Sequence, residues 1–226
     1  MSLPLLILRP FDGALQTERR ASDLGMLAVV DPLFDVESIR WSGPEPKEFD
    51  ALLLTSANAL KYGGVQVDAY RSLPVLAVGK KTAAAAEGAG FLVAETGESD
   101  AQHLFDQLKD AQYQNILWLA GEQYTEVFAA GRDVHVVPVY RSKAIALGAQ
   151  AQACLAEETI ILVHSSRAAR QLGSELDRLD LPRSRYHVLA FSAKVAEACG
   201  PGWKSLQSAS HPDDEALLSL ASALCR

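Results

Sequence analysis

The sequence lacks the short motifs that mark several large enzyme classes. Neither GxGxxG nor GxxxxGK followed by Ser or Thr occurs, which weighs against dinucleotide-binding and P-loop proteins. The five histidines show no HExxH or other paired spacing, so no metal site is expected. No GxSxG surrounds a serine, and the adjacent residues His164 and Ser165 would point in different directions from a strand end. Nucleophilic catalysis is therefore not expected.

Cysteines and long apolar runs are also scarce. Cys154, Cys199 and Cys225 are widely spaced and form no CxxC, which is typical of reduced thiols in a cytoplasmic protein. No apolar run approaches the roughly 18 residues of a membrane span. The first residues, MSLPLLILRPFDG, have too short an apolar stretch and no basic leader, so no signal peptide is expected. We expect a cytoplasmic protein that does not contact the membrane.

Basic residues are fewer than acidic ones. The chain has 21 Lys and Arg against 28 Asp and Glu, which gives a net charge of −7. A general nucleic-acid binder needs a basic face to neutralise phosphates, so this class is not expected. The net charge does not exclude a locally basic cleft, because Arg9, Lys80, Lys81 and Arg167 follow predicted strands.

What the sequence does contain is an α/β pattern. With 226 residues and an apolar share of 49%, the chain can bury one large core or two small ones. Short apolar runs such as 5–8 and 51–54 predict strands buried on both faces of parallel sheets. Helical spacing is found at 15–26, 83–90, 100–112 and 213–225. Ser99 or Asp100 is the predicted N-cap of the helix at 100–112.

The strongest pattern is an internal repeat. LLLTSANAL (52–60) matches ILVHSSRAARQL (161–172), and VLAVGKKTAAAAEGAGF (75–91) matches VLAFSAKVAEACGPGWKSL (188–206). Looser matches join LLILRP (5–10) to ILWLAG (116–121), and VVDPLFDVE (29–37) to VVPVYRSKA (136–144). The common order favours duplication over chance similarity between alanine-rich helices. The prediction is two small doubly wound sheets, with Pro32 and Pro138 in connectors or edge strands.

Small polar and basic residues follow the predicted strands, where doubly wound folds bind ligands. Each could simply cap a helix, whereas several helix N-termini around one cleft would suit carboxylates or phosphates. Both interpretations stay open. Tyr140, beside Arg141 in a predicted connector, could likewise pack structurally or act on a ligand. The strand-end residues are Arg9, Thr55, Ser56, Asn58, Gly79, Lys80, Thr82, His164, Ser165, Ser166, Arg167, Ser192 and Lys194.

Taken together, these motifs resemble the uroporphyrinogen-III synthases, cofactor-free enzymes that close the tetrapyrrole ring in haem biosynthesis. The resemblance covers nearly the whole chain in family order. The segments that carry it are LILRP (6–10), LLLTSANAL (52–60), VLAVGKKTAAAAEGAGF (75–91), VPVYR (137–141), HSSRAA (164–169) and HPDDEALLSLASAL (211–224).

The resemblance implies an α/β fold of two flavodoxin-like doubly wound parallel-sheet domains joined by a two-stranded linker. The first domain would comprise residues 1–35 and 143–226, and the second residues 36–142. The linker strands would be about 30–37 and 136–142. The resemblance further implies a monomer that binds hydroxymethylbilane, a linear tetrapyrrole with eight carboxylates, in the cleft between the domains. It also suggests handover of this substrate from hydroxymethylbilane synthase.

The implied reaction is a cyclising loss of water, a lyase reaction, through a spiro intermediate that inverts ring D. Tyr140 matches the family's connector tyrosine, a proposed general acid, although a phenol is a weak acid for this task. Asp213 stands where many relatives have threonine, and we assign it to helix capping. The residues expected to bind substrate are Arg9, Ser56, Asn58, Lys80, Thr82, Ser165, Ser166, Arg167 and Ser192.

Two alternatives remain. A two-lobed binding or sensor protein for an anionic small molecule would share the shape without the catalysis. A flavin or sugar-phosphate enzyme on a flavodoxin-like fold would retain a bound cofactor on purification. The isomer of the cyclised product separates the first alternative from the synthase, and bound cofactor would indicate the second.

Overall fold

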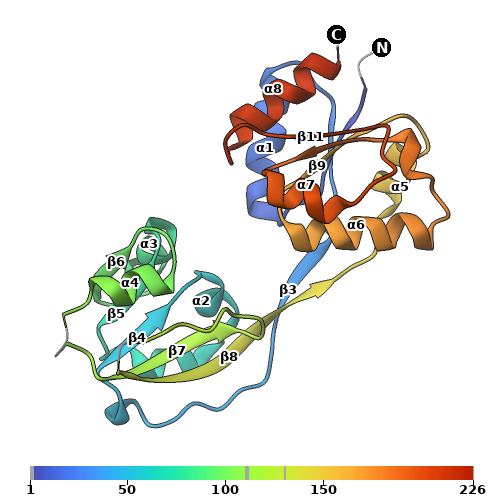
Figure 1. Cartoon of the computed structure of the whole chain (residues 1–226). Helices are drawn as coiled ribbons and strands as arrows, with labels where there is room; N and C mark the ends of the chain where they lie inside the picture. The colour runs from blue at the N-terminus through green and yellow to red at the C-terminus, as the bar shows by residue number, and fades with distance from the viewer. Residues whose placement is uncertain (1–2, 110–111, 130, 226) are drawn as a thin grey trace. The chain divides into compact units, whose positions relative to one another are not determined.

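A computed structural model describes residues 3–109, 112–129 and 131–225 of the chain (Figure 1). The chain divides into two compact units. Unit 1 comprises residues up to Asp35 together with those from Ala144 onward, and unit 2 comprises Val36–Lys143. The chain passes between them twice, within β3 (Phe34–Ser38) and at the end of β8 (Asp133–Ala144).

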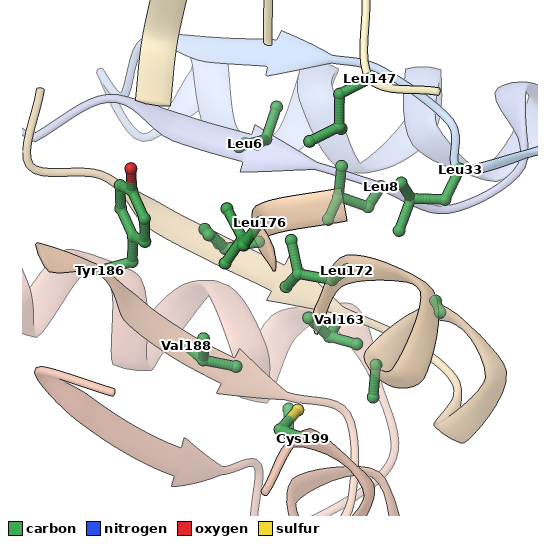
Figure 2. Packing of buried hydrophobic residues seen from close by; sticks show 14 of the residues in the cluster. Leu6, Leu8, Leu33, Leu147, Val163, Leu172, Leu176, Tyr186, Val188 and Cys199 are labelled. Atoms are coloured by element: carbon green, nitrogen blue, oxygen red, sulfur yellow. The ribbon is translucent and has the colours of Figure 1, made fainter. Parts of the chain in front are cut away.

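Unit 1 is built on a five-stranded parallel sheet of order β11-β10-β9-β1-β2. Alternate residues of its strands point to opposite faces, which separates two apolar cores. Leu6, Ile161 and Val188 face the helices α5, α6 and α7, as Figure 2 shows in part. Leu5, Ile160 and Leu189 face α1 and α8. The elements are β1 (Leu5–Ile7), α1 (Phe11–Asp23), β2 (Ala28–Val30), α5 (Ala149–Leu155), β9 (Ile160–Val163), α6 (Ser166–Arg178), η3 (Arg183–Arg185), β10 (His187–Ala190), α7 (Ala193–Cys199), β11 (Ser205–Ser208) and α8 (Asp214–Leu224).

Unit 2 repeats this plan in a six-stranded sheet of order β3-β8-β7-β4-β5-β6. Leu52, Val75 and Leu117 face α2, η2 and α3, whereas Leu53, Leu76 and Trp118 face α4. The elements are η1 (Pro46–Glu48), β4 (Ala51–Leu54), α2 (Asn58–Tyr62), η2 (Val65–Tyr70), β5 (Val75–Val78), α3 (Lys80–Gly88), β6 (Val93–Gly97), α4 (Ala101–Gln107) and β7 (Asn115–Gly121), besides β3 and β8.

The sheet orders place the repeated segments at equivalent positions. The series β11-β10-β9-β1-β2 of unit 1 corresponds to β6-β5-β4-β7-β8 of unit 2. The registers agree as well, since Leu5 pairs with Ile160 and the matching Ile116 pairs with Ala51. The repeat in the sequence is therefore also a repeat in the structure. The order along the chain differs, because β4, β5 and β6 precede β7 and β8, whereas their counterparts β9, β10 and β11 follow β1 and β2.

The segments β3 and β8 run beside each other in opposite directions. Ile39 donates its N–H to the carbonyl of Val139, and Ile145 donates to the carbonyl of Leu33. From the first bond to the second, the residue number falls on the β3 side and rises on the β8 side, which is the pattern of antiparallel strands. Because β3 flanks β8, β8 is not an edge strand, but it leads from unit 2 to unit 1, which is the connector position expected as the other possibility for Pro138. Proline is tolerated there because it pairs with Ala120 at the register shift between β7 and β8, where the ladder of hydrogen bonds is irregular.

Candidate active site and the polar strand ends

Unit 2 has a cavity of about 350 Å³ at the carboxyl ends of its strands. Thr55, Val78, Gly121 and Tyr140 line it from β4, β5, β7 and β8, residues 99–102 line it from the start of α4, and residues 123–127 close one side. Its polar groups are mainly hydroxyls and side-chain amides, with the carboxylates of Asp100 and Glu126. Among the described lining residues there is no lysine, arginine or histidine. The cavity therefore suits a neutral or cationic group better than a carboxylate.

Tyr140 owes its place to an irregularity between β7 and β8. The register shifts after Ala120, which pairs with Pro138, so that Gly121 pairs with Tyr140 and Val139 is skipped. Such bulges re-aim side chains near functional sites. A Cβ on Gly121 would lie 3.0 Å from ring carbons of Tyr140 and 3.1 Å from its hydroxyl oxygen. The phenol thus lies directly against the bare backbone of Gly121.

Trp118 forms the back of this cavity. Its ring is 3% exposed, its Nε1–H donates to the hydroxyl of Thr55 at 3.3 Å, and its edge meets the ring of Tyr124 at 5.3 Å. A buried indole N–H needs such an acceptor. The bond fixes Thr55, whose hydroxyl hydrogen is left to point toward a ligand or water.

The other residues predicted in unit 2 lie near these strand ends but outside the cavity lining. The hydroxyl of Ser56 accepts from the N–H of Asn58 at 3.2 Å, at the start of α2. Lys80 is exposed at the first position of α3, and Thr82 is 5% exposed in its first turn. The N-cap position of α2 is occupied by Ala57, so Ser56 does not cap this helix but makes a local hydrogen bond in the turn before it. Whether these four residues bind substrate stays a prediction.

Unit 1 has a buried ionic cluster at the corresponding end of its sheet. Nη1 of Arg9 donates to both carboxylate oxygens of Asp214, at 2.8 and 2.9 Å. Thr17 donates to Asp214 at 2.9 Å, and Nε2 of His164 lies 3.1 Å from it. The Asp214 side chain is 9% exposed and that of Arg9 is 27% exposed. Arg9, predicted to bind substrate, thus has a carboxylate partner within its own unit.

His164 is held neutral by its surroundings. Its side chain is 8% exposed, and burial together with the charge of Arg9 lowers its pKa from the ordinary 6.5 to about 4. Of the buried side-chain polar atoms that the structure describes, only its Nδ1 has no hydrogen-bond partner. Donation from Nε2–H to Asp214 leaves Nδ1 as an unused acceptor, so protonation would add a charge that burial disfavours.

The remaining predicted residues of unit 1 begin helices. Ser165 caps α6 by accepting from Ala168 N–H at 3.1 Å, and Ser192 caps α7 by accepting from Val195 N–H at 3.4 Å. Ser166 donates to the carbonyl of Lys194 at 3.3 Å. The guanidinium of Arg167 lies 4.0 Å from the ring centre of Phe34. The sheet order brings Arg9, Ser165 and Ser192 to neighbouring strand ends.

The capping role of Asp213 is confirmed, since its Oδ1 accepts from Ala216 N–H at 2.7 Å. Several residues at these sites were not predicted, namely Gly121, Tyr124, Gln102 and Asp214, while Trp118 was expected to be a core or interface residue. One feature of the sequence could have drawn attention to Asp214. It directly follows the helix cap Asp213, which corresponds in the repeat to the cap Asp100. The others depend on side-chain packing that no local pattern reports.

Neither a membrane-spanning helix nor a metal-binding group occurs in the described part of the chain. No helix there is long and apolar enough to cross a bilayer. No group of three His, Cys, Asp or Glu side chains within 3–109, 112–129 and 131–225 is placed to hold a metal ion.

Fold and site together define a two-unit α/β protein with polar strand ends and a tyrosine-lined cavity. Comparison with protein families identifies the class further, since the model described as uroporphyrinogen-III synthase HemD matches residues 16–219. The chain belongs to the uroporphyrinogen-III synthase family, whose members are enzymes of tetrapyrrole biosynthesis.

Solved structures support the same fold. The uroporphyrinogen-III synthetase of Helicobacter pylori is 18% identical with a TM-score of 0.66, over 99% of this chain and 100% of that one. A mutant uroporphyrinogen-III synthase of Thermus thermophilus is 15% identical with a TM-score of 0.52, over 99% of both chains. No curated protein matched the chain. The predicted α/β fold class is confirmed.

Proposed function

We propose that this protein converts hydroxymethylbilane to uroporphyrinogen III, a cofactor-independent lyase reaction with loss of water and inversion of ring D. The observation that carries the proposal is the cavity of unit 2, where the Tyr140 phenol lies on Gly121 among neutral hydroxyls and amides. The family membership supplies the substrate class.

The reaction needs little from the protein beyond folding the substrate and assisting one departure. The hydroxymethyl C–O bond breaks, Tyr140 gives a proton to the leaving hydroxide, and water forms. The ring A azafulvene cation that remains is attacked by the substituted carbon of ring D to give the spiro intermediate, which fragments and closes with ring D inverted. The proton that ring D loses as it regains aromaticity restores the Tyr140 phenol. Holding the two ends together supplies much of the acceleration.

The charges of the cavity suit the reacting end of the substrate and not its carboxylate arms. Asp100 and Glu126 would repel the carboxylate arms of the bilane, but they favour the positive charge that develops on a pyrrole as hydroxide leaves. The arms would then contact basic and helix-start groups such as Lys80 and Arg167. That the substrate contacts both units, that the protein acts as a monomer, and that it receives substrate from hydroxymethylbilane synthase stay predictions.

The decisive test supplies the purified protein with freshly prepared hydroxymethylbilane and separates the oxidised products by isomer. Uncatalysed closure gives the type I ring, so predominant type III product would support the synthase. Type I product alone, at the rate of the blank, would refute it and favour a binding protein for the same ligand.

Replacement of Tyr140 by phenylalanine should lower kcat by roughly 10²-fold, the lower end of what a general acid contributes. Tyr62→Phe is the matched control, because Tyr62 lies in α2 of the same unit and outside the cavity. Equal rates for the two variants would remove Tyr140 from the mechanism.

A further inference from the structure

The segment that follows β7 forms one wall of the Tyr140 cavity. We call residues 122–129 the wall loop. It lies between β7 and β8 without helix or strand, and its residues 123–127 line the cavity. The loop is exposed over most of its length, and Phe128 is 76% exposed. Core packing holds it only in part, through Val127, which packs against the core on the α4 side of the sheet, so its position depends largely on specific contacts.

Four contacts besides that of Val127 attach the wall loop to the rest of unit 2, and the last of them is at the Ala129 carbonyl, which accepts from Arg132 N–H at 3.1 Å and from its Nη1 at 3.3 Å. At its start, Glu122 donates its N–H to the carbonyl of Tyr140 at 2.8 Å. In its middle, the ring of Tyr124 meets the edge of Trp118. Near its end, Phe128 is held by the side chain of Gln102, which projects from α4.

The third attachment is a two-way hydrogen bond through a single side chain. Oε1 of Gln102 accepts from Phe128 N–H at 2.7 Å, and Nε2 donates to the Phe128 carbonyl at 3.0 Å. A carboxamide has the donor and the acceptor that the backbone of one residue requires. The second hydrogen of Nε2 goes to Asp106 Oδ1 at 2.9 Å, one helical turn along, which fixes the amide orientation.

We propose that Gln102 is a positioning residue that, by fixing Phe128, holds the wall loop in the place where it shapes the Tyr140 cavity around the reacting end of the substrate. Gln102 itself lines the cavity from the opposite element, so one side chain joins both walls. This inference rests on the proposed function. Because the carboxylate arms would bind elsewhere, loss of the Gln102 side chain should disturb the alignment of the reacting groups more than it weakens substrate binding.

The first measurement needs no substrate. Hydrogen exchange is followed in the peptide covering 122–129 for the full-length protein and for Gln102→Ala, Gln102→Glu and Gln107→Ala. Gln107 is the matched control, because it lies on the same helix and its side-chain amide is hydrogen-bonded to His103 one turn earlier in that helix. We expect at least tenfold faster exchange in Gln102→Ala and an unchanged rate in Gln107→Ala. Unchanged exchange in Gln102→Ala would overturn the attachment.

The second measurement is kinetic, with type III product quantified separately. In Gln102→Ala, kcat should fall about tenfold while KM changes less than threefold. Gln102→Glu keeps an acceptor for Phe128 N–H, but its second oxygen would face the Phe128 carbonyl and the Asp106 carboxylate, so its exchange rate and its kcat should change about as much as in Gln102→Ala. Faster exchange with unchanged kcat would overturn the positioning role.

The two measurements also separate this inference from the function on which it rests. A wild-type protein that forms no type III product would refute the proposed function and the catalytic part of the inference. The exchange rates would still decide whether Gln102 holds the wall loop. A loss of kcat in Gln107→Ala equal to that in Gln102→Ala would show a general effect of α4 and would also overturn the proposal.

Discussion

Equivalent ends of the two sheets hold opposite kinds of structure. In unit 1 the adjacent strands β1 and β9 are followed by Arg9 and His164, which both contact Asp214. In unit 2 the matching positions, near the ends of β7 and β4, hold Ala120 and Thr55. The position that corresponds to Asp214, the residue after the helix cap, is Ala101.

The exchange of these residues explains why the strand ends of unit 2 leave the Tyr140 cavity, whereas the equivalent space around Asp214 in unit 1 is occupied by charged side chains. Charged side chains fill the strand ends of unit 1 and neutralise one another there. In unit 2, Ala101, Gly121 and Thr55 leave space, and that space is the Tyr140 cavity. Duplicated sheets can therefore diverge through the size and charge of a few side chains, because the backbone of each half is fixed by its buried strands.

The largest expected effect comes from breaking the cluster of unit 1. Asp214→Ala leaves the charge of Arg9 without its partner in a mostly buried place, and the free energy of unfolding should fall by about 3 kcal/mol. We choose the lower part of the usual range because Arg9 is 27% exposed and keeps some contact with water. Urea denaturation measures the change. A loss below about 1 kcal/mol would mean that the cluster contributes little.

The acid stability of unit 1 should depend on His164. Its pKa in the folded protein is about 4, below the ordinary 6.5, so the unfolded chain binds a proton first as the pH falls. Stability from this residue is complete above pH 6.5 and is lost between pH 6.5 and 4. The loss is up to about 3 kcal/mol.

His164→Gln, which keeps a donor for Asp214, should reduce the difference in unfolding free energy between pH 7 and pH 4 by about that amount. Denaturant titrations of both proteins at the two pH values check it. An unchanged difference would place the acid sensitivity elsewhere in the chain.

Filling the bare position of unit 2 should impair activity more than stability. In Gly121→Ala the new Cβ would lie 3.0 Å from the Tyr140 ring, so the ring must move by a few tenths of an ångström. Gly121 has no positive φ, so the backbone accepts alanine. We expect kcat to fall about tenfold, because a misplaced catalytic group loses its alignment.

Gly88→Ala is the matched control, since a Cβ there meets no atom within 4 Å. Steady-state kinetics on both variants separates a local effect on Tyr140 from a general effect of the substitution. A fully active Gly121→Ala would mean that the contact between Tyr140 and the bare backbone is unimportant.

The smallest effect is expected for the two helix caps that occupy equivalent positions. Asp213 caps α8 and Asp100 caps α4, each through one hydrogen bond to a backbone N–H. Asp213→Ala and Asp100→Ala should each cost about 1 kcal/mol. Only Asp100→Ala should also change activity, because Asp100 lines the cavity. Thermal denaturation and kinetics on both variants would test this, and equal activity would weaken the cavity as the active site.

Local sequence patterns predicted most of the secondary structure. The buried strands, the caps Asp100, Ser165 and Asp213, and the repeat all follow from residues close together in the chain. Boundaries were less certain, as α1 begins at Phe11 rather than near residue 15 and α4 ends at Gln107 rather than at 112. Helix ends depend on packing and on the next turn, which spacing alone does not specify.

The sequence by itself determined that two parallel sheets form, which strands correspond, and that polar groups follow them, because buried strands and caps are encoded locally. Tertiary structure alone decided what those groups do. Arg9 meets Asp214 across 205 positions of the chain, and a shift of register between β7 and β8 turns Tyr140 onto Gly121. Contacts between distant segments depend on register and on the sizes of facing side chains, so the cavity of unit 2 and the ionic cluster of unit 1 could not be read from the sequence.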